Sequence, residues 1–281
     1  MLKDVMKTLI AVVIVADGVA GQEIPEGAWE NSIVGSVNMT QTGFDNWAAG
    51  GENAFAWQVN VNFKFVQLLE KTTWSNSGKI VYGAIKIGNA DVQKSVDEIK
   101  MESVLIYKRG SSINPFIAFT GETQLAAGYS YGTDPALQIS AFMDPGFFRE
   151  SLGAGMELRK DLTTRLGLSF KQTVTTDYPA PYADDIETLE VETLRSEFGV
   201  ESVTDMLMNI SETSSIVSKL ELFSTLNALD EIDVGWDNTL TVKISEYINM
   251  NVNLKLVYDN DISPKRQLKQ SMALGINYTF I

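Results

Sequence analysis

The chain has 281 residues, enough for one large domain or two small ones. It contains no cysteine and no histidine, which excludes disulfides, thiolate chemistry, Cys or His metal sites and a Ser-His-Asp triad. A formal net charge of −14 argues against a nucleic-acid partner. No apolar run reaches the about 18 residues that a membrane helix requires.

The first residues predict a cleavable secretory signal peptide over residues 1–21. Lys3 and Lys7 supply positive charge, an apolar core follows over Leu9–Ala16, and small residues suitable for cleavage end the segment. A helical N-terminal extension is the alternative interpretation. One domain is then expected over residues 22–281, and export without cysteine suits an envelope protein that does not depend on oxidative folding.

Large apolar residues alternate with small or polar residues along several segments. The clearest case is Gln270–Phe280, and the same period of two recurs in Phe55–Phe65, Ile232–Ile244 and Ile248–Tyr258. This period predicts strands with one apolar face and one polar face. Segments of about ten residues with such faces are typical of strands that cross a membrane.

In chain order, the pattern predicts about twelve strands. They cover residues 31–42, 54–67, 72–86, 96–108, 114–126, 148–159, 162–174, 194–206, 214–224, 232–244, 247–258 and 267–281. A short helical turn is expected within Asp184–Leu194, and a turn is expected near Met208–Thr213.

The predicted connections alternate between short and long along most of the chain. The short links are 69–71, 109–114, 160–161 and 245–246, and the long links are 43–53, 88–95, 127–147, 175–193 and 259–266. Outer-membrane barrels have short periplasmic turns and long outer loops. The sequence therefore predicts an all-β, transmembrane, antiparallel up-and-down barrel of about 12 strands in the outer membrane of a Gram-negative bacterium. Ten or fourteen strands, or a soluble sandwich or lipocalin-like barrel, are the alternatives.

Three motifs carry a family resemblance. Phe44–Asn53 contains an N-W-A-x-G-G-x-N signature, Asp233–Asn238 contains a tryptophan within a strand, and Tyr258–Asp261 is an acidic loop. From about Trp29 onward the chain resembles an uncharacterised family of outer-membrane barrels. The resemblance implies a barrel and no catalytic residues. Outer-membrane lipid, and insertion machinery that reads the C-terminal strand, are then the expected partners, although such barrels usually end on an aromatic residue and this chain ends on Ile281.

If the apolar faces meet lipid, the polar faces point into the barrel and carry both signs of charge. The candidate lumen-lining residues are Lys64, Glu98, Lys100, Glu102, Glu122, Glu157, Arg165, Lys171, Lys219, Glu221, Asp233, Asp237, Lys243 and Lys255. A lumen of about twelve strands is narrower than that of the large porins. The mixed charges are expected either to pair and close the lumen or to line a narrow conducting pore.

The loops supply the candidates for recognition. Gly50 and Gly51 permit tight turns, and Trp47 beside them either contacts a ligand or folds back as a lid. Tyr129 and Tyr131 begin an aromatic stretch that either constricts the pore, caps a lipophilic ligand or packs as an outer loop.

Acidic residues cluster in two of the links. They are Asp184, Asp185, Glu187, Glu190 and Glu192 in one link, and Asp259 and Asp261 in the other. Carboxylates can hold calcium, but no EF-hand spacing is present, so a solvated acidic surface is the main interpretation. No metal or cofactor is predicted.

Function follows from this architecture only in outline. The sequence predicts a small, narrow pore or transport protein with a charged lumen, and no enzyme. A barrel with a closed lumen, acting through its extracellular loops on an unidentified surface partner, is the first alternative. A membrane hydrolase using carboxylates or a metal in place of histidine is the second.

Overall fold

The computed structural model describes residues 27, 29–45, 48–49, 51–110, 112–180, 182–184 and 188–280. The predicted signal peptide lies outside the described residues. None of the described residues forms a helix that could cross a membrane.

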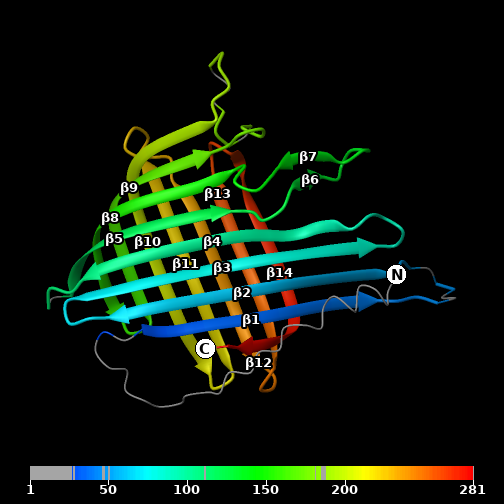
Figure 1. Cartoon of the computed structure of the whole chain (residues 1–281), viewed down its shortest axis with the longest axis horizontal. Coiled ribbons are helices and arrows are strands. Elements are labelled where there is room, and N and C mark those ends of the chain that lie inside the picture. The colour runs from blue at the N-terminus through cyan, green and yellow to red at the C-terminus, as the bar shows by residue number, and fades with distance from the viewer. Residues whose placement is uncertain are drawn as a thin grey trace.

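Twelve strands form one closed antiparallel barrel, in which each strand pairs with its two neighbours (Figure 1). They are β1 (Trp29–Thr42), β2 (Ala54–Leu68), β3 (Thr72–Ile87), β4 (Gln93–Tyr107), β5 (Ile113–Thr123), β8 (Gly146–Arg159), β9 (Leu162–Val174), β10 (Leu194–Ser211), β11 (Ser214–Thr225), β12 (Asp233–Lys243), β13 (Ile248–Asp259) and β14 (Ser263–Thr279). The predicted fold and strand number are confirmed, because β14 returns to pair with β1.

Two local expectations were wrong: the loop expected over residues 127–147 contains two strands, and the link expected over residues 259–266 is shorter. A small hairpin of β6 (Gly128–Ser130) and β7 (Leu137–Ser140) lies in a stretch expected to be a loop. The turn expected near Met208–Thr213 is confirmed at residues 212–213, although the strand before it continues as far as Ser211. The expected long link 259–266 is a turn of residues 260–262, because β14 already begins at Ser263. The described residues of the expected helical turn, 184 and 188–194, contain no helix.

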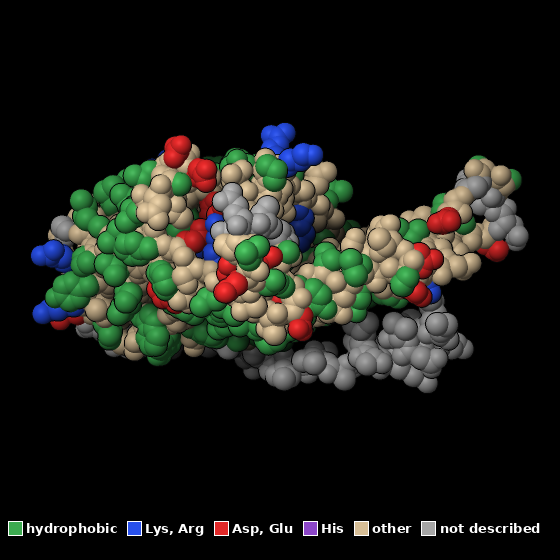
Figure 2. All heavy atoms as spheres, turned by 90° about the horizontal axis from the view of Figure 1, so that it is seen from above, with side chains coloured by type: hydrophobic (Ala, Val, Ile, Leu, Met, Phe, Trp, Pro, Cys, Tyr) green, Lys and Arg blue, Asp and Glu red, His purple; other side chains and the backbone are tan. Residues whose placement is uncertain are grey.

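The two faces of the barrel wall differ in polarity. Large hydrophobic residues are exposed on the outside, for example Leu152 at 59% and Ile117 at 57%, whereas Glu98 and Glu201 on the inside are 7% and 4% exposed. Figure 2 shows hydrophobic side chains over the outer wall, with acidic and basic side chains in the recess of the barrel. A soluble fold would bury the apolar face, so this wall faces lipid and the barrel spans a membrane.

The two ends of the barrel also differ. Both ends of the strand series, Trp29 and Thr279, lie at the end where the links are short, such as residues 69–71 and 212–213. The opposite end carries the long links 43–53, 124–145 and 175–193. We call the first of these two ends of the barrel the short-turn end and the opposite one the long-loop end. All twelve strands of the barrel run between these two distinct ends, as the strands of membrane barrels do.

The barrel is flattened, so that β1–β4 cross β10–β13 behind them, and the wall turns sharply at β8, β9 and β10 (Figure 1). Small residues occupy this corner. A Cβ on Gly153 would lie 2.2 Å from the carbonyl oxygen of Leu166, and a Cβ on Gly167 would lie 2.4 Å from that of Leu152. The two glycines are directly paired, so the close backbone approach at the corner depends on both.

Candidate functional site: the charged lumen

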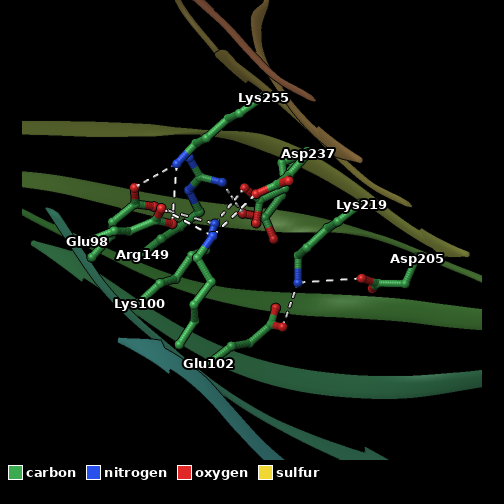
Figure 3. A network of polar contacts seen from close by, with 12 residues as sticks. Glu98, Lys100, Glu102, Arg149, Asp205, Lys219, Asp237 and Lys255 are labelled. Carbon is green, nitrogen blue, oxygen red and sulfur yellow. Dashed lines mark hydrogen bonds and ion pairs between the residues drawn. The ribbon is translucent and has the colours of Figure 1, made fainter. Parts of the chain in front are cut away.

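Charged side chains meet across the lumen from strands that are not neighbours in the wall. Lys100 on β4 donates to Glu221 on β11 at 2.9 Å. Lys255 on β13 donates to Glu122 on β5 at 3.2 Å. Because β4 and β5 lie on one wall and β11 and β13 on the other, these contacts pass through the interior (Figure 3).

The central cluster joins three lysines to four carboxylates at mid-height in the barrel. Its members are Lys79, Glu98, Lys100, Glu122, Glu221, Asp237 and Lys255. Lys79 lies 3.2 Å from Glu98 and 3.5 Å from Asp237, and Lys255 lies 3.4 Å from Glu98. Every charge in this cluster has an opposite charge within 3.5 Å, and such pairing offsets part of the cost of burying charged groups.

A second group, the constriction cluster, lies closer to the short-turn end. Glu102 pairs with Arg165 and, at 2.6 Å, with Lys219, and Lys219 lies 3.5 Å from Asp205. The Arg165 guanidinium also lies 5.8 Å from the centre of the Phe116 ring. Phe116 packs in a buried apolar group with Val104 and Ala118. Apolar packing and ion pairs therefore narrow the lumen at the same level.

A third group, the upper cluster, lies toward the long loops. Lys171 contacts three carboxylates: Asp233 at 2.7 Å, Asp259 at 3.0 Å and Glu197 at 3.3 Å. Its ammonium group lies 5.2 Å from the centre of the Phe223 ring. Arg149, at 5.5 Å from the same ring, pairs with Glu201. Lys171 on β9 thus connects its own strand to three others, because its partners lie on β10, β12 and β13.

Cavities lie on both sides of the constriction cluster in the described part of the chain. Three of them, of about 390, 180 and 390 Å³, adjoin the central cluster and share lining residues such as Lys255. A fourth, of about 480 Å³, lies at the short-turn end and shares no lining residue with the others. Glu102 and Lys219 line one side of this division, and Arg165 and Asp205 line the other. The pairs Glu102–Arg165 and Lys219–Asp205 therefore separate two spaces that are large enough for water.

The long loop 175–193 reaches the upper mouth of the lumen. The buried Asp144 carboxylate accepts the backbone N–H groups of Thr176 at 3.0 Å and Asp177 at 2.7 Å, which fixes the start of the loop. Further along, the Tyr182 ring meets Phe147 edge-on, with centroids 6.1 Å apart. Burial raises the pKa of Tyr182, so its phenol stays neutral. Both rings line the cavity next to Lys255.

Most of the lumen candidates come together in these three clusters. The exceptions are Lys64, Glu157 and Lys243, which are exposed and have no ion pair with any described residue. The loop candidates do not join the site. Trp47 and Gly50 lie outside the described residues.

The other three loop candidates have local structural contacts. Gly51 has a φ of +142°, and a Cβ there would lie 2.5 Å from the Phe44 ring. The Tyr131 hydroxyl accepts the backbone N–H of Lys94 at 3.0 Å, and its ring lies 6.3 Å from that of Tyr129. The hairpin that carries both tyrosines points away from the lumen (Figure 1).

Several residues of the clusters were missed by the sequence analysis. They are Lys79, Arg149, Glu197, Glu201 and Asp205. Each lies an even number of residues along its strand from a polar residue that points inward. The alternation in the sequence therefore contained a signal for its inward position. It was hidden because small or apolar residues such as Val81, Gly199 and Val203 also point inward.

The acidic links do not form a metal site among the residues that the structure describes. No group of three or more carboxylates there could hold an ion. Asp259 and Asp261 instead pair with Lys171 and Arg195.

Solved structures similar to this chain include several membrane barrels. The translocator domain of the autotransporter NalP from Neisseria meningitidis is 12% identical, with 99% of this chain and 92% of that chain covered and a TM-score of 0.38. The NanC porin is 9% identical, with 87% and 98% covered and a TM-score of 0.40. An outer-membrane channel from Pseudomonas putida F1 is 11% identical, with 94% and 99% covered and a TM-score of 0.39. At such scores none of them bears on what this chain does.

Two families of unknown function match the chain in sequence, and no curated protein matches it. Residues 39–129 match the family described as "Protein of unknown function (DUF3078)". Residues 127–280 match the family described as "Protein of unknown function, DUF481". Since the second match covers more than half of the 281 residues, the chain belongs to the DUF481 family.

Proposed function

We propose that the protein is a narrow pore of the Gram-negative outer membrane, with a charged constriction that admits small polar solutes. The observation that carries this proposal is the pair of spaces on either side of the constriction cluster, between which the pairs Glu102–Arg165 and Lys219–Asp205 lie. The Asp205 side chain is 44% exposed, so hydration offsets much of its attraction to Lys219 and this pair can rearrange readily. A small rearrangement of these side chains would join the two spaces.

The proposed location rests on the architecture. A closed antiparallel barrel with an apolar outer wall, short turns at one end and long loops at the other is typical of outer-membrane proteins. The expected partners are the surrounding lipid, the insertion machinery that reads the C-terminal strand, and a small solute that passes the lumen.

A closed barrel is the second candidate, and one observation favours it. Lys100–Glu221 and Lys255–Glu122 cross the lumen and connect opposite walls. If these bridges persist, the lumen remains blocked at mid-height and the barrel acts through its loops. The two candidates differ in one measurable property, which is ion flow.

Single-channel recording in planar bilayers tests the proposal. The purified protein should conduct weakly, and the double variant Arg165→Ser/Lys219→Ser should conduct several-fold more and prefer cations, because Glu102 and Asp205 then remain unpaired in a wider passage. Lys243→Ser is the matched control, since it removes an inward lysine that forms no ion pair with the described residues. A tight seal over a wide voltage range for both the parent and the double variant would reject the pore and favour the closed barrel.

A further inference from the structure

The barrel is closed by a short seam. β1 and β14 pair only between Val34–Asn38 and Gly275–Thr279. At Ser263 and over Gln267–Leu274, β14 pairs with β13 on one side, and no described strand is paired with its other edge there. Every residue over 264–272 is exposed, whereas every residue over 249–258 of the adjacent β13 is half-buried. The long-loop half of β14 is therefore a free strand edge beside the lumen.

A cavity continues from the lumen to this edge. The cavity of about 390 Å³ is lined by Glu122 and Lys255 inside the barrel and by residues 267–269 of the free edge. Lys269 is paired with Lys255 and shares its inward face, while the intervening Leu268 points outward. The cavity therefore extends from the lumen to the unpaired edge of β14.

The free edge is basic in a strongly acidic protein. Lys265, Arg266 and Lys269 are exposed, and none of them has an ion pair with a described residue, although the chain carries a net charge of −14. The outward residues Leu268, Met272 and Leu274 on the same edge are exposed and apolar. The edge thus offers cations at the long-loop end and an apolar surface toward the middle of the barrel, which complements an anionic lipid.

Pairing with another strand fits this edge poorly. Pro264 has no N–H to donate, and Lys265 and Lys269 would repel the same edge of a second copy. Proline and lysine are the residues that protect exposed edges against strand addition. A lipid needs no backbone pairing, so it meets neither obstacle.

We propose that the free edge of β14 is a lateral binding site for an anionic lipid of the leaflet at the long-loop end, recognised by its phosphate group. The phosphate lies among Lys265, Arg266 and Lys269, and the acyl chains lie over Leu268 and Met272. This site requires the barrel to sit in a bilayer but holds whether the lumen conducts or is closed, so a failure of the pore proposal leaves it intact.

Native mass spectrometry of the full purified protein in detergent tests the site. The probes are phosphatidylglycerol and phosphatidylcholine with identical acyl chains. The protein should retain phosphatidylglycerol in preference, and the variant K265Q/R266Q/K269Q should bind it between about tenfold and 100-fold more weakly. The matched control K71Q/R109Q/K160Q removes two lysines and one arginine from the short turns and should bind as the parent does.

A second variant tests the apolar half of the site. It also keeps the proposal testable if the first variant does not fold. L268E keeps the three cations but opposes the acyl chains, so it should also weaken retention of phosphatidylglycerol. Equal retention of the two lipids, or an equal loss in the control variant, would overturn the proposal. Displacement of the lipid by inorganic phosphate alone would also overturn it, because this result would indicate a site for the free anion. Formation of a dimer in place of lipid binding would overturn it as well, because this result would indicate strand pairing.

Discussion

Lys100 on β4 and Glu221 on β11 form a 2.9 Å ion pair although four strands separate them along the shorter arc of the barrel wall. The bridge therefore connects the two broad walls of the flattened barrel through its interior (Figure 3). Lys100 also lies 3.4 Å from Glu122 on its own side. One ammonium group thus balances carboxylates from both walls, which links the charge pattern of the lumen directly to the stability of the fold.

We expect Lys100→Met to lower the free energy of unfolding by about 2–4 kcal/mol, because it leaves Glu221 without its partner in a partly buried position. Unfolding by urea in lipid vesicles measures this loss. The double variant Lys100→Met/Glu221→Leu should lose less than the sum of the two single variants, since the unpaired carboxylate is then absent. Lys243→Met, which breaks no ion pair, should change the free energy by less than about 0.5 kcal/mol. An equal loss in that control would contradict the role of the bridge.

Two copies of one hydrogen-bonded arrangement lie on the outer wall. The Trp74 indole donates to the Ser103 hydroxyl at 2.9 Å, and that hydroxyl donates to the Asn76 amide oxygen at 2.8 Å. The second copy, Trp236–Ser218–Asn238, repeats it with distances of 3.0 and 2.7 Å. The first copy lies near the short-turn end and the second near the long-loop end. They mark the levels where an amphipathic tryptophan meets the membrane interface.

Ser103→Ala should cost about 1–3 kcal/mol of unfolding free energy, because the Trp74 indole and the Asn76 amide would lose their shared partner on a lipid-facing wall. The same urea titration in vesicles checks this. Ser271→Ala is the control, since Ser271 is an exposed residue of the free edge of β14. If the two variants were equally stable, the hydroxyl would contribute nothing at the interface.

Alternation in the sequence predicted the barrel strands because the lipid and the lumen impose opposite polarities on the two faces. The prediction stopped early for β10, where the apolar run Met206–Met208 and Ile210 hides the alternation. It started late for β14, since Pro264, Lys265 and Arg266 resemble a loop. The hairpin of β6 and β7 escaped because its strands are too short to show a period.

The site was less accessible to sequence reasoning than the fold. Alternation predicts which face a residue occupies but not its height in the barrel, which depends on the stagger between strands. Lys100 and Glu221 could therefore be expected to face inward but not to meet. Arg149 was missed because the two aromatic residues before it, Phe147 and Phe148, hide the alternation of polar and apolar residues at the start of β8. The free edge of β14 depends on the register of the last pairing, for which the sequence contains no local signal.

The corner of the wall at β8 and β9 should be sensitive to a single methyl group. Gly153→Ala would place a Cβ 2.2 Å from the Leu166 carbonyl oxygen, so the backbone would have to separate. We expect a loss of several kcal/mol or failure to fold. Gly155→Ala, on the same face two residues away, would meet its nearest atom at 3.6 Å and should fold normally. The yield of folded barrel after refolding into detergent micelles distinguishes the two. Equal yields would contradict the close approach at the corner.

Cysteine pairs can report the extent of the seam, because the natural chain has no cysteine to interfere. Ser36 and Asn277 are directly paired, and the Asn277 N–H points away from β1 to donate to Tyr247. They therefore form a non-hydrogen-bonded pair, whose Cα separation of about 4.5 Å suits a disulfide. Ser36→Cys/Asn277→Cys should cross-link readily under mild oxidation.

The same register, continued toward the long-loop end, would set Thr40 opposite Ala273, but β1 and β14 are not paired there. Thr40→Cys/Ala273→Cys should therefore remain reduced under conditions that oxidise the first pair, and both thiols should react with a maleimide reagent. Mobility on non-reducing gels reads out the cross-link, and mass measurement counts the labels. Equal cross-linking of the two pairs would mean that the seam extends along the whole of β14, and the lateral lipid site would then lose the open edge on which it depends.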